Sequence, residues 1–162
     1  MAFDNTVLQS HADLPAGEFI AASPYNVSAF EVFEDGLVAG RFAKFDTASI
    51  DNLDGSATPV IAGIVKRKIT GEISATDQVY STTGDAQDSV AEVINFGFAT
   101  VTVTDAATPA KYDTVQVIND GTADAGKATD AAVAAGIISA GDVTFWEQKA
   151  ANVWLVRINK YL

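Results

Sequence analysis

Short runs in which apolar and polar residues alternate recur along most of the chain from residue 28 onward. Alternation with period two, in segments rich in valine, isoleucine, threonine and aromatic residues, predicts half-buried β-strands. About seven such runs, separated by turn residues, predict a mainly-β protein folded as a single compact β-sandwich or β-barrel domain. The predicted strands span residues 28–33, 37–45, 60–69, 90–104, 112–119, 142–148 and 153–158.

Glycines mark the places where the strands turn or bend. The turn-forming segment 34–36, which ends in Gly36, predicts that strands 28–33 and 37–45 form a hairpin. Gly40 and Gly97 fall inside predicted strands. A glycine at such a position indicates a bulge or a close approach of another part of the backbone.

Three polar segments separate the strands. Residues 46–58 and 75–88 are rich in serine, threonine, aspartate and glycine, and they are predicted to be loops. Residues 120–141 are rich in alanine, glycine and aspartate. This last segment is predicted to hold either a short helix at 129–135 or only a loop.

Residues 1–24 show neither helical nor strand periodicity, and Pro15, Gly17 and Pro24 interrupt them. We therefore predict an extended N-terminal arm over residues 1–24 and a β domain over residues 25–162. We expect the arm to contribute to docking rather than to the core of the domain; a frayed terminus is the alternative. Residues 1–20 contain no lysine or arginine, so no secretory signal is expected.

Composition narrows the range of partners. The chain has 162 residues, 48% of them hydrophobic, which is enough apolar material for a core. It carries 21 acidic against 10 basic residues, a net charge of -11, so neither nucleic acid nor a membrane is expected as a partner. Cysteine is absent, which excludes disulfides, thiolate metal sites and a thiol nucleophile.

One segment resembles a phosphate-binding loop. Residues 121–127 match the pattern GxxxxGK, but Ala128 stands where serine or threonine would hold Mg²⁺. Asp120, Asp124 and Asp130 surround this loop, and their charges would repel a phosphate. We therefore predict a loop that binds no nucleotide, and no cofactor is expected.

No other pattern supports catalysis or a resident metal. The single histidine, His11, lies in the predicted arm, where it is not held beside a nucleophile. Loop carboxylates cluster in residues 46–54 and again at Asp120 and Asp124, but they lack the alternate spacing of an EF-hand loop. The sequence therefore predicts a protein that is not an enzyme, with no catalytic residues and no metal ligands.

The predicted hairpin of residues 142–148 and 153–158 holds both tryptophans and provides candidate interface residues. Alternation places Trp154 on one face of its strand, and apolar groups occur on both faces of the hairpin. One face is expected in the core and the other against a neighbour, with Trp146 on this second face. The basic run 66–68 is a second candidate for docking an acidic partner, a solvated strand edge being the alternative. The candidate interface residues are thus Trp146, Trp154, Lys66, Arg67 and Lys68.

Four stretches resemble the capsid cement, or head decoration, proteins of bacteriophages. The resemblance extends over residues 28–160 and concerns the pattern of small-residue strands followed by a late aromatic hairpin. The stretches that carry it are Gly36–Lys44, Pro59–Val65, Ala110–Val117 and Phe145–Val156.

The resemblance implies a β domain with arms that binds the outer surface of an icosahedral phage head and bridges neighbouring major capsid subunits. It further implies a homo-oligomer, with a trimer favoured over a dimer, which is made in the host cytoplasm and located on the capsid exterior. It transfers no functional residues, because the family has no site motif. A carbohydrate-binding or adhesin-like β module is the alternative, and exposed tryptophans on a concave face would favour it.

Overall fold

The computed structural model describes residues 16–18, 24–33, 36–68, 79–80 and 90–159. Within these residues the protein is built from strands and turns, and no helix occurs among them. The mainly-β class predicted from the alternating pattern is confirmed. The strands are β1 (Asn26–Glu31), β2 (Leu37–Val38), β3 (Phe42–Asp46), β4 (Ser49–Asp51), β5 (Ile61–Val65), β6 (Val79–Tyr80), β7 (Val90–Thr102), β8 (Thr114–Ile118), β9 (Ala128–Thr129), β10 (Ile137–Ala150) and β11 (Val153–Ile158).

Most strands form one curled sheet in the order β4-β3-β5-β7-β11-β10-β8-β9, and β1 also pairs with β7. Strands β2 and β6 form a separate two-stranded sheet. Isolated bridges link both ends of the large sheet back to its middle. At the β9 end, Ala128 bridges Val103, which follows β7. At the β4 end, Ile50 bridges Val32, which follows β1. The sheet therefore curls on itself at both ends, which protects strand edges that would otherwise be exposed.

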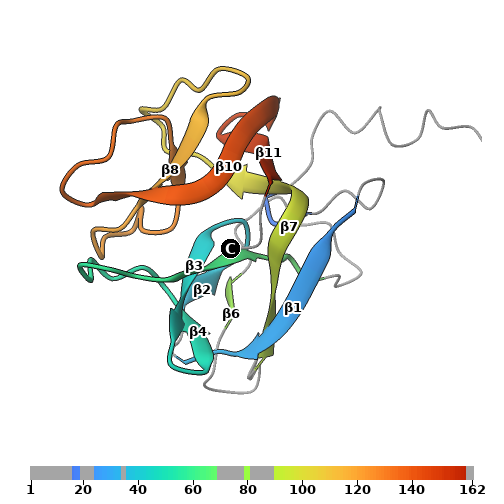
Figure 1. The fold of residues 1–162 in the computed structure, drawn as a ribbon, viewed down its shortest axis with the longest axis vertical. Helices are drawn as coiled ribbons and strands as arrows, with labels where there is room; N and C mark the ends of the chain where they lie inside the picture. Colours follow the sequence, from blue (N-terminus) through green and yellow to red (C-terminus); the bar gives the residue numbers. More distant parts are fainter. Residues whose placement is uncertain (1–15, 19–23, 34–35, 69–78, 81–89, 160–162) are drawn as a thin grey trace, which may run out of the picture.

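The long strand β7 runs through both halves of the molecule (Figure 1). Its first part pairs with β1 and β5, and its second part pairs with β11. Gly97 lies between these parts with φ +102°, and a Cβ there would lie 2.7 Å from the carbonyl oxygen of Pro24. The predicted interruption at Gly97 is thus the point at which β7 exchanges partners and another segment passes close to its backbone.

The apolar residues form two core clusters, and both include residues of β3, β5 and β7. The larger cluster contains Val101, Phe145 and Val156 and receives residues from β7, β8, β10 and β11. The smaller one contains Ile50, Val65 and Val93 and fills the space between β1, β3, β4 and β5. Alternate residues of β7 thus contribute to both cores, as its period-two pattern predicts.

Three residues of the predicted arm, Ala16–Glu18, lie against the β domain. The amide of Gly17 donates to the carbonyl oxygen of Thr100 (2.9 Å), and the amide of Arg67 donates to the carbonyl oxygen of Gly17 (2.9 Å). A Cβ on Gly40 would lie 2.2 Å from that of Ala16, so Gly40 does mark a close backbone approach. Residues 1–15 and 19–23 lie outside the described residues, so the boundary of the arm at residue 24 stays a prediction.

The predicted hairpin of residues 28–33 and 37–45 is wrong. Strand β1 pairs with β7, whereas β3 pairs with β4 and β5. The residues just after β1 lie beside β4, and the amide of Phe33 donates to the carbonyl oxygen of Ile50 (2.9 Å). Turn residues allow the chain to reverse, but burial against distant strands determined which strands pair.

Of the two alternatives predicted for residues 129–135, the loop is correct and the helix is not formed; the hydroxyl of Thr129 accepts from the amide of Ala131 (3.2 Å), a local bond that competes with helical bonding. Two further expectations need correction. The predicted loops 46–58 and 75–88 contain the short strands β4 and β6, although most of the second loop lies outside the described residues. Strand β5 ends at Val65 and not at residue 69.

Candidate interface site

The β10–β11 hairpin points its two tryptophans in different directions. Phe145 pairs with Val156 and Glu147 pairs with Leu155, so β10 carries one extra residue, Trp146, between them. Such a bulge redirects a side chain away from the regular pleat. Trp154 packs against the larger core and contacts the ring of Phe145 edge to face at 5.6 Å between centroids. Trp146 instead contacts rings outside that core.

Trp146 forms the centre of an aromatic cluster on the outer face of the sheet. Its ring lies 5.4 Å from that of Phe98 and 5.5 Å from that of Tyr112, at interplanar angles of 78° and 84°. The ammonium of Lys111 lies 4.2 Å from the centroid of the Trp146 ring, and the guanidinium of Arg157 lies 6.0 Å from that of Phe98. We call Phe98, Lys111, Tyr112, Trp146 and Arg157 the aromatic–cation patch.

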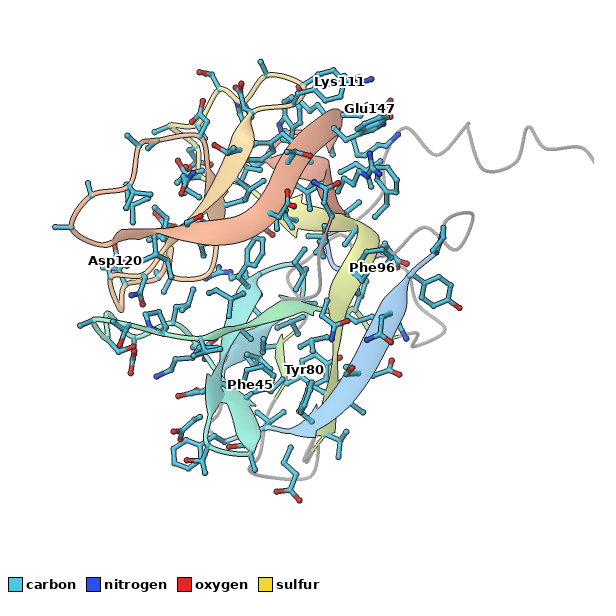
Figure 2. The ribbon with its side chains drawn as sticks, in the orientation of Figure 1. Phe45, Tyr80, Phe96, Lys111, Asp120 and Glu147 are labelled. Atoms are coloured by element: carbon cyan, nitrogen blue, oxygen red, sulfur yellow. The ribbon has the colours of Figure 1, made fainter. Side chains whose placement is uncertain are left out.

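The patch combines residues far apart in the sequence. Phe98 and Arg157 are paired across β7 and β11, and Trp146 comes from the bulge of β10. Figure 2 shows Lys111 at the same end of the molecule as Glu147, whereas Phe45 and Tyr80 lie in the opposite half. Tyr112 is 63% exposed, and Trp146 and Phe98 are half-buried, so the rings are available at the surface.

A tight turn holds Lys111 and Tyr112 over Trp146. The amide of Asp113 donates to the carbonyl oxygen of Ala110 (3.1 Å), and the amide of Ala110 donates to the carboxylate of Asp113 (2.8 Å). Tyr112 adopts φ +77°, a left-handed conformation that is unusual for a bulky residue. Its amide donates to the carbonyl oxygen of Phe145 (2.7 Å), the residue before Trp146. The turn is therefore fixed to the bulge itself.

The cations of the patch differ from four other cations in the described part of the protein. Lys44, Lys66, Lys127 and Lys149 each form an ion pair with an aspartate or glutamate. Within the described part of the chain, neither Lys111 nor Arg157 has such a carboxylate partner, and each lies over aromatic rings instead. The patch is thus a local concentration of uncompensated positive charge on an acidic protein.

The basic run that was predicted as a docking site is engaged within the protein. Lys66 forms an ion pair with Glu92, and Arg67 is only 8% exposed. The ammonium of Lys68 lies 4.3 Å from the centroid of the Tyr80 ring. A role for these three cations at an interface stays a prediction.

The loop that resembles a phosphate-binding loop uses its own amides internally. The amide of Thr122 donates to the carboxylate of Asp120 (2.9 Å), and the amide of Ala125 donates to the carbonyl oxygen of Thr122 (3.1 Å). Lys127 forms an ion pair with Asp124 (2.6 Å), and this contact lowers the pKa of Asp124 below its usual value, with a smaller contribution from Arg41. Donors that are already satisfied and a neutralised lysine leave no cradle for a phosphate.

The loop carboxylates are held by neighbouring protein groups. Lys44 donates to Asp54 (2.7 Å) and, with a further bond from the amide of Ser56, lowers the pKa of Asp54 to about 2. No group of three or more potential metal ligands occurs in the part of the chain that the structure describes. His11 lies outside that part.

Four members of the patch were missed from the sequence: Phe98, Lys111, Tyr112 and Arg157. Phe98 and Arg157 meet through the register of β7 and β11, which alternation alone does not determine. Lys111 and Tyr112 reach Trp146 through a turn, where periodicity gives no information. No sequence signal identified them.

Aromatic residues and arginine are enriched in protein interfaces, so a curled, mainly-β domain with an aromatic–cation patch on its outer face has the features of a protein that binds other protein surfaces. The family model of the XM1 gp53 minor capsid protein matches residues 3–160 of the chain. A chain of the solved structure described as "The capsid of Myoviridae Phage XM1" has 67% sequence identity and a TM-score of 0.86, with 100% of each chain covered. None of the curated proteins compared with the chain matches it.

The chain therefore belongs to the XM1 gp53 minor capsid protein family. It is a capsid-associated structural protein of a phage virion, and the predicted relation to phage capsid proteins is confirmed. The described residues include no helix long and apolar enough to span a membrane.

Proposed function

We propose that this protein is a cement protein, which binds the outer surface of the phage head and bridges neighbouring major capsid subunits. The observation that carries this proposal is the aromatic–cation patch on a chain whose family is named for the capsid. Aromatic residues and arginine are enriched at the centres of protein interfaces, where they provide most of the binding energy. Half-buried rings around Trp146 provide such a centre.

The protein acts as a homo-oligomer, with a trimer favoured over a dimer. Bridging several shell subunits from one oligomer adds many weak contacts, and the summed affinity exceeds that of any one contact. Light scattering of the purified protein at micromolar concentrations measures the oligomeric state, and a monomer there would contradict this part of the proposal.

A carbohydrate-binding module is the second candidate, and the geometry disfavours it. Stacking on a sugar ring needs a flat aromatic face that is open to solvent. Lys111 covers one face of the Trp146 ring, and the neighbouring rings stand nearly perpendicular to it. Trp154 is packed against the core and offers no platform.

The test uses phage shells that lack this protein. Wild-type protein added to such shells should bind at a fixed number of sites, which electron microscopy locates on the outer surface between shell subunits. Trp146→Ala should remain folded but lose at least about tenfold in shell affinity, as expected for a central interface residue. The matched control is Val133→Ala, which removes an apolar side chain that is 60% exposed outside the patch and should bind normally.

Two outcomes would contradict the proposal. Failure of the wild-type protein to bind shells would exclude a cement role. Equal affinities of the Trp146 and Val133 variants would show that the shell contacts another face of the protein.

A further inference from the structure

We infer that the aromatic–cation patch binds an acidic segment of a shell subunit, with Lys111 and Arg157 each pairing with a carboxylate. This inference rests on the proposed function and identifies the chemistry of the partner at the same site. It requires that the two cations are accessible, that they lack a carboxylate within the protein and that the protein holds them in place. The structure meets each of these requirements.

Accessibility and the lack of a partner follow from the surroundings of the two cations. Lys111 and Arg157 are both exposed. The described chain places no aspartate or glutamate in ion-pair contact with either, although acidic residues outnumber basic ones by 21 to 10. A contact with an aromatic face leaves the positive charge of a cation intact, so each can still pair with an anion.

The patch is also held in a defined geometry. The Lys111 ammonium lies 4.2 Å from the Trp146 centroid and 5.1 Å from that of Tyr112, so two rings orient it. Tyr112 is kept in a left-handed conformation in which glycine would be less strained. Backbone strain of this kind is maintained at sites where the side chain has a function. A cation fixed before binding loses less conformational entropy when it pairs with an anion.

Charge decides between the possible anions. The net charge of -11 opposes the approach of a polyanionic nucleic acid, whose backbone carries a phosphate at every nucleotide. A contact of the patch with the same patch of a second copy would bring the cations of both copies together, which like-charge repulsion opposes. An acidic segment of a shell subunit requires only local complementarity at the patch. Apolar groups of the same segment would pack on the rings of Phe98 and Trp146.

The experiment measures the affinity of the full-length protein for shells that lack it, over a range of salt concentrations. The double variant Lys111→Gln, Arg157→Gln removes both charges and keeps polar side chains of moderate length. It should bind at least about tenfold more weakly at low salt and depend less on salt than the wild type. The control Lys127→Gln removes one cation that is already paired with Asp124, and it should bind as the wild type does.

Carbodiimide coupling of the protein–shell complex then identifies the partner group. The reagent activates a carboxylate, and a lysine amine in contact with it forms an amide as the activated oxygen leaves with the reagent as a urea. We expect Lys111 to be joined to an aspartate or glutamate of the shell protein, as mass spectrometry of the joined peptides would show.

The possible failures are distinguishable. Wild-type protein that does not bind shells overturns the proposed function itself. Shell binding that is the same for the double variant and for Lys127→Gln overturns only this inference. Coupling of Lys111 to another copy of this chain, with dissociation of the oligomer in the double variant, would make a second copy the occupant. Competition by a neutral oligosaccharide would make the occupant a sugar. Either result overturns the inference that the patch binds an acidic segment of a shell subunit.

Discussion

Replacing Tyr112 with glycine should separate the stability of the protein from its binding to the shell. Tyr112 has φ +77°, and its amide donates to Phe145, so the conformation is fixed from outside the turn. A left-handed conformation costs a residue with a Cβ about 1–2 kcal/mol, and glycine escapes this cost. The same substitution removes a ring that contacts Trp146 and belongs to the proposed interface.

The size of the expected change in stability comes from comparing the free energies of unfolding of the glycine and alanine variants at this position. Both variants lose the edge-to-face contact with Trp146, which is worth about 0.5–1.5 kcal/mol. Glycine also loses about 0.4–1 kcal/mol because it makes the unfolded chain more flexible. The relief of strain exceeds this loss, so Tyr112→Gly should be more stable than Tyr112→Ala by about 1 kcal/mol. In a protein of this size that difference is about 2–4 °C in Tm.

Thermal and denaturant unfolding of the two variants test the argument. The control pair is Thr114→Gly and Thr114→Ala, an exposed position on β8 without positive φ, where alanine should be the more stable variant. Both Tyr112 variants should bind shells equally weakly, because both lack the ring. An alanine variant at position 112 that equals or exceeds the glycine variant in stability would refute the strain on which the reasoning depends.

Four further outcomes are expected from the same structure. Trp154→Ala, measured by denaturant unfolding, should lose about 3 kcal/mol, since the ring packs on the larger core. Gly17→Ala should lower the free energy of unfolding by on the order of 3 kcal/mol, because its Cβ would lie 2.9 Å from three backbone atoms. By NMR titration, the Asp54 pKa should be about 2 and should rise toward 3.8 in Lys44→Met. Because the folded pKa is depressed, its stabilising contribution is present above about pH 4 and is lost as the pH falls through about 2. Mg-ATP should not change the Tm; stabilisation that is lost in Lys127→Ala would contradict this.

The sequence predicted the strands better than their partners. Alternation in β8 corresponds to more and less buried positions in the structure, because the pleat itself imposes period two, whereas β7 and β11 also bury consecutive residues such as Leu155 and Val156. The partner of β1 was not predictable from its neighbouring turn. Pairing with β7, about 60 residues further along the chain, depends on how the two cores divide the apolar residues, and no local pattern records this division.

The candidate site was predictable only where a single residue carried the signal. Trp146 was placed on the outer face because alternation separates it from Phe145. Its neighbours Phe98 and Arg157 come from strands whose register is a property of the whole sheet. Likewise, Lys66–Lys68 form a conspicuous basic run in the sequence, yet Lys66 pairs with Glu92, Lys68 lies over the ring of Tyr80 and Arg67 is buried. Charge density along the chain was therefore a poor guide to charge available at the surface.

In an acidic protein, a small number of available cations makes the orientation of binding more specific. Interactions between exposed charges are screened beyond about 10 Å at moderate salt, so a net charge of -11 acts mainly as a short-range repulsion of acidic surfaces that approach the protein away from the patch. The cations paired within the protein cannot offset that repulsion at a contact. Lys111 and Arg157, which are held on aromatic rings, can offset the repulsion, and they do so only when the partner approaches the patch. Attraction at one small site against repulsion elsewhere selects one binding geometry, which is what the proposed bridging of shell subunits requires.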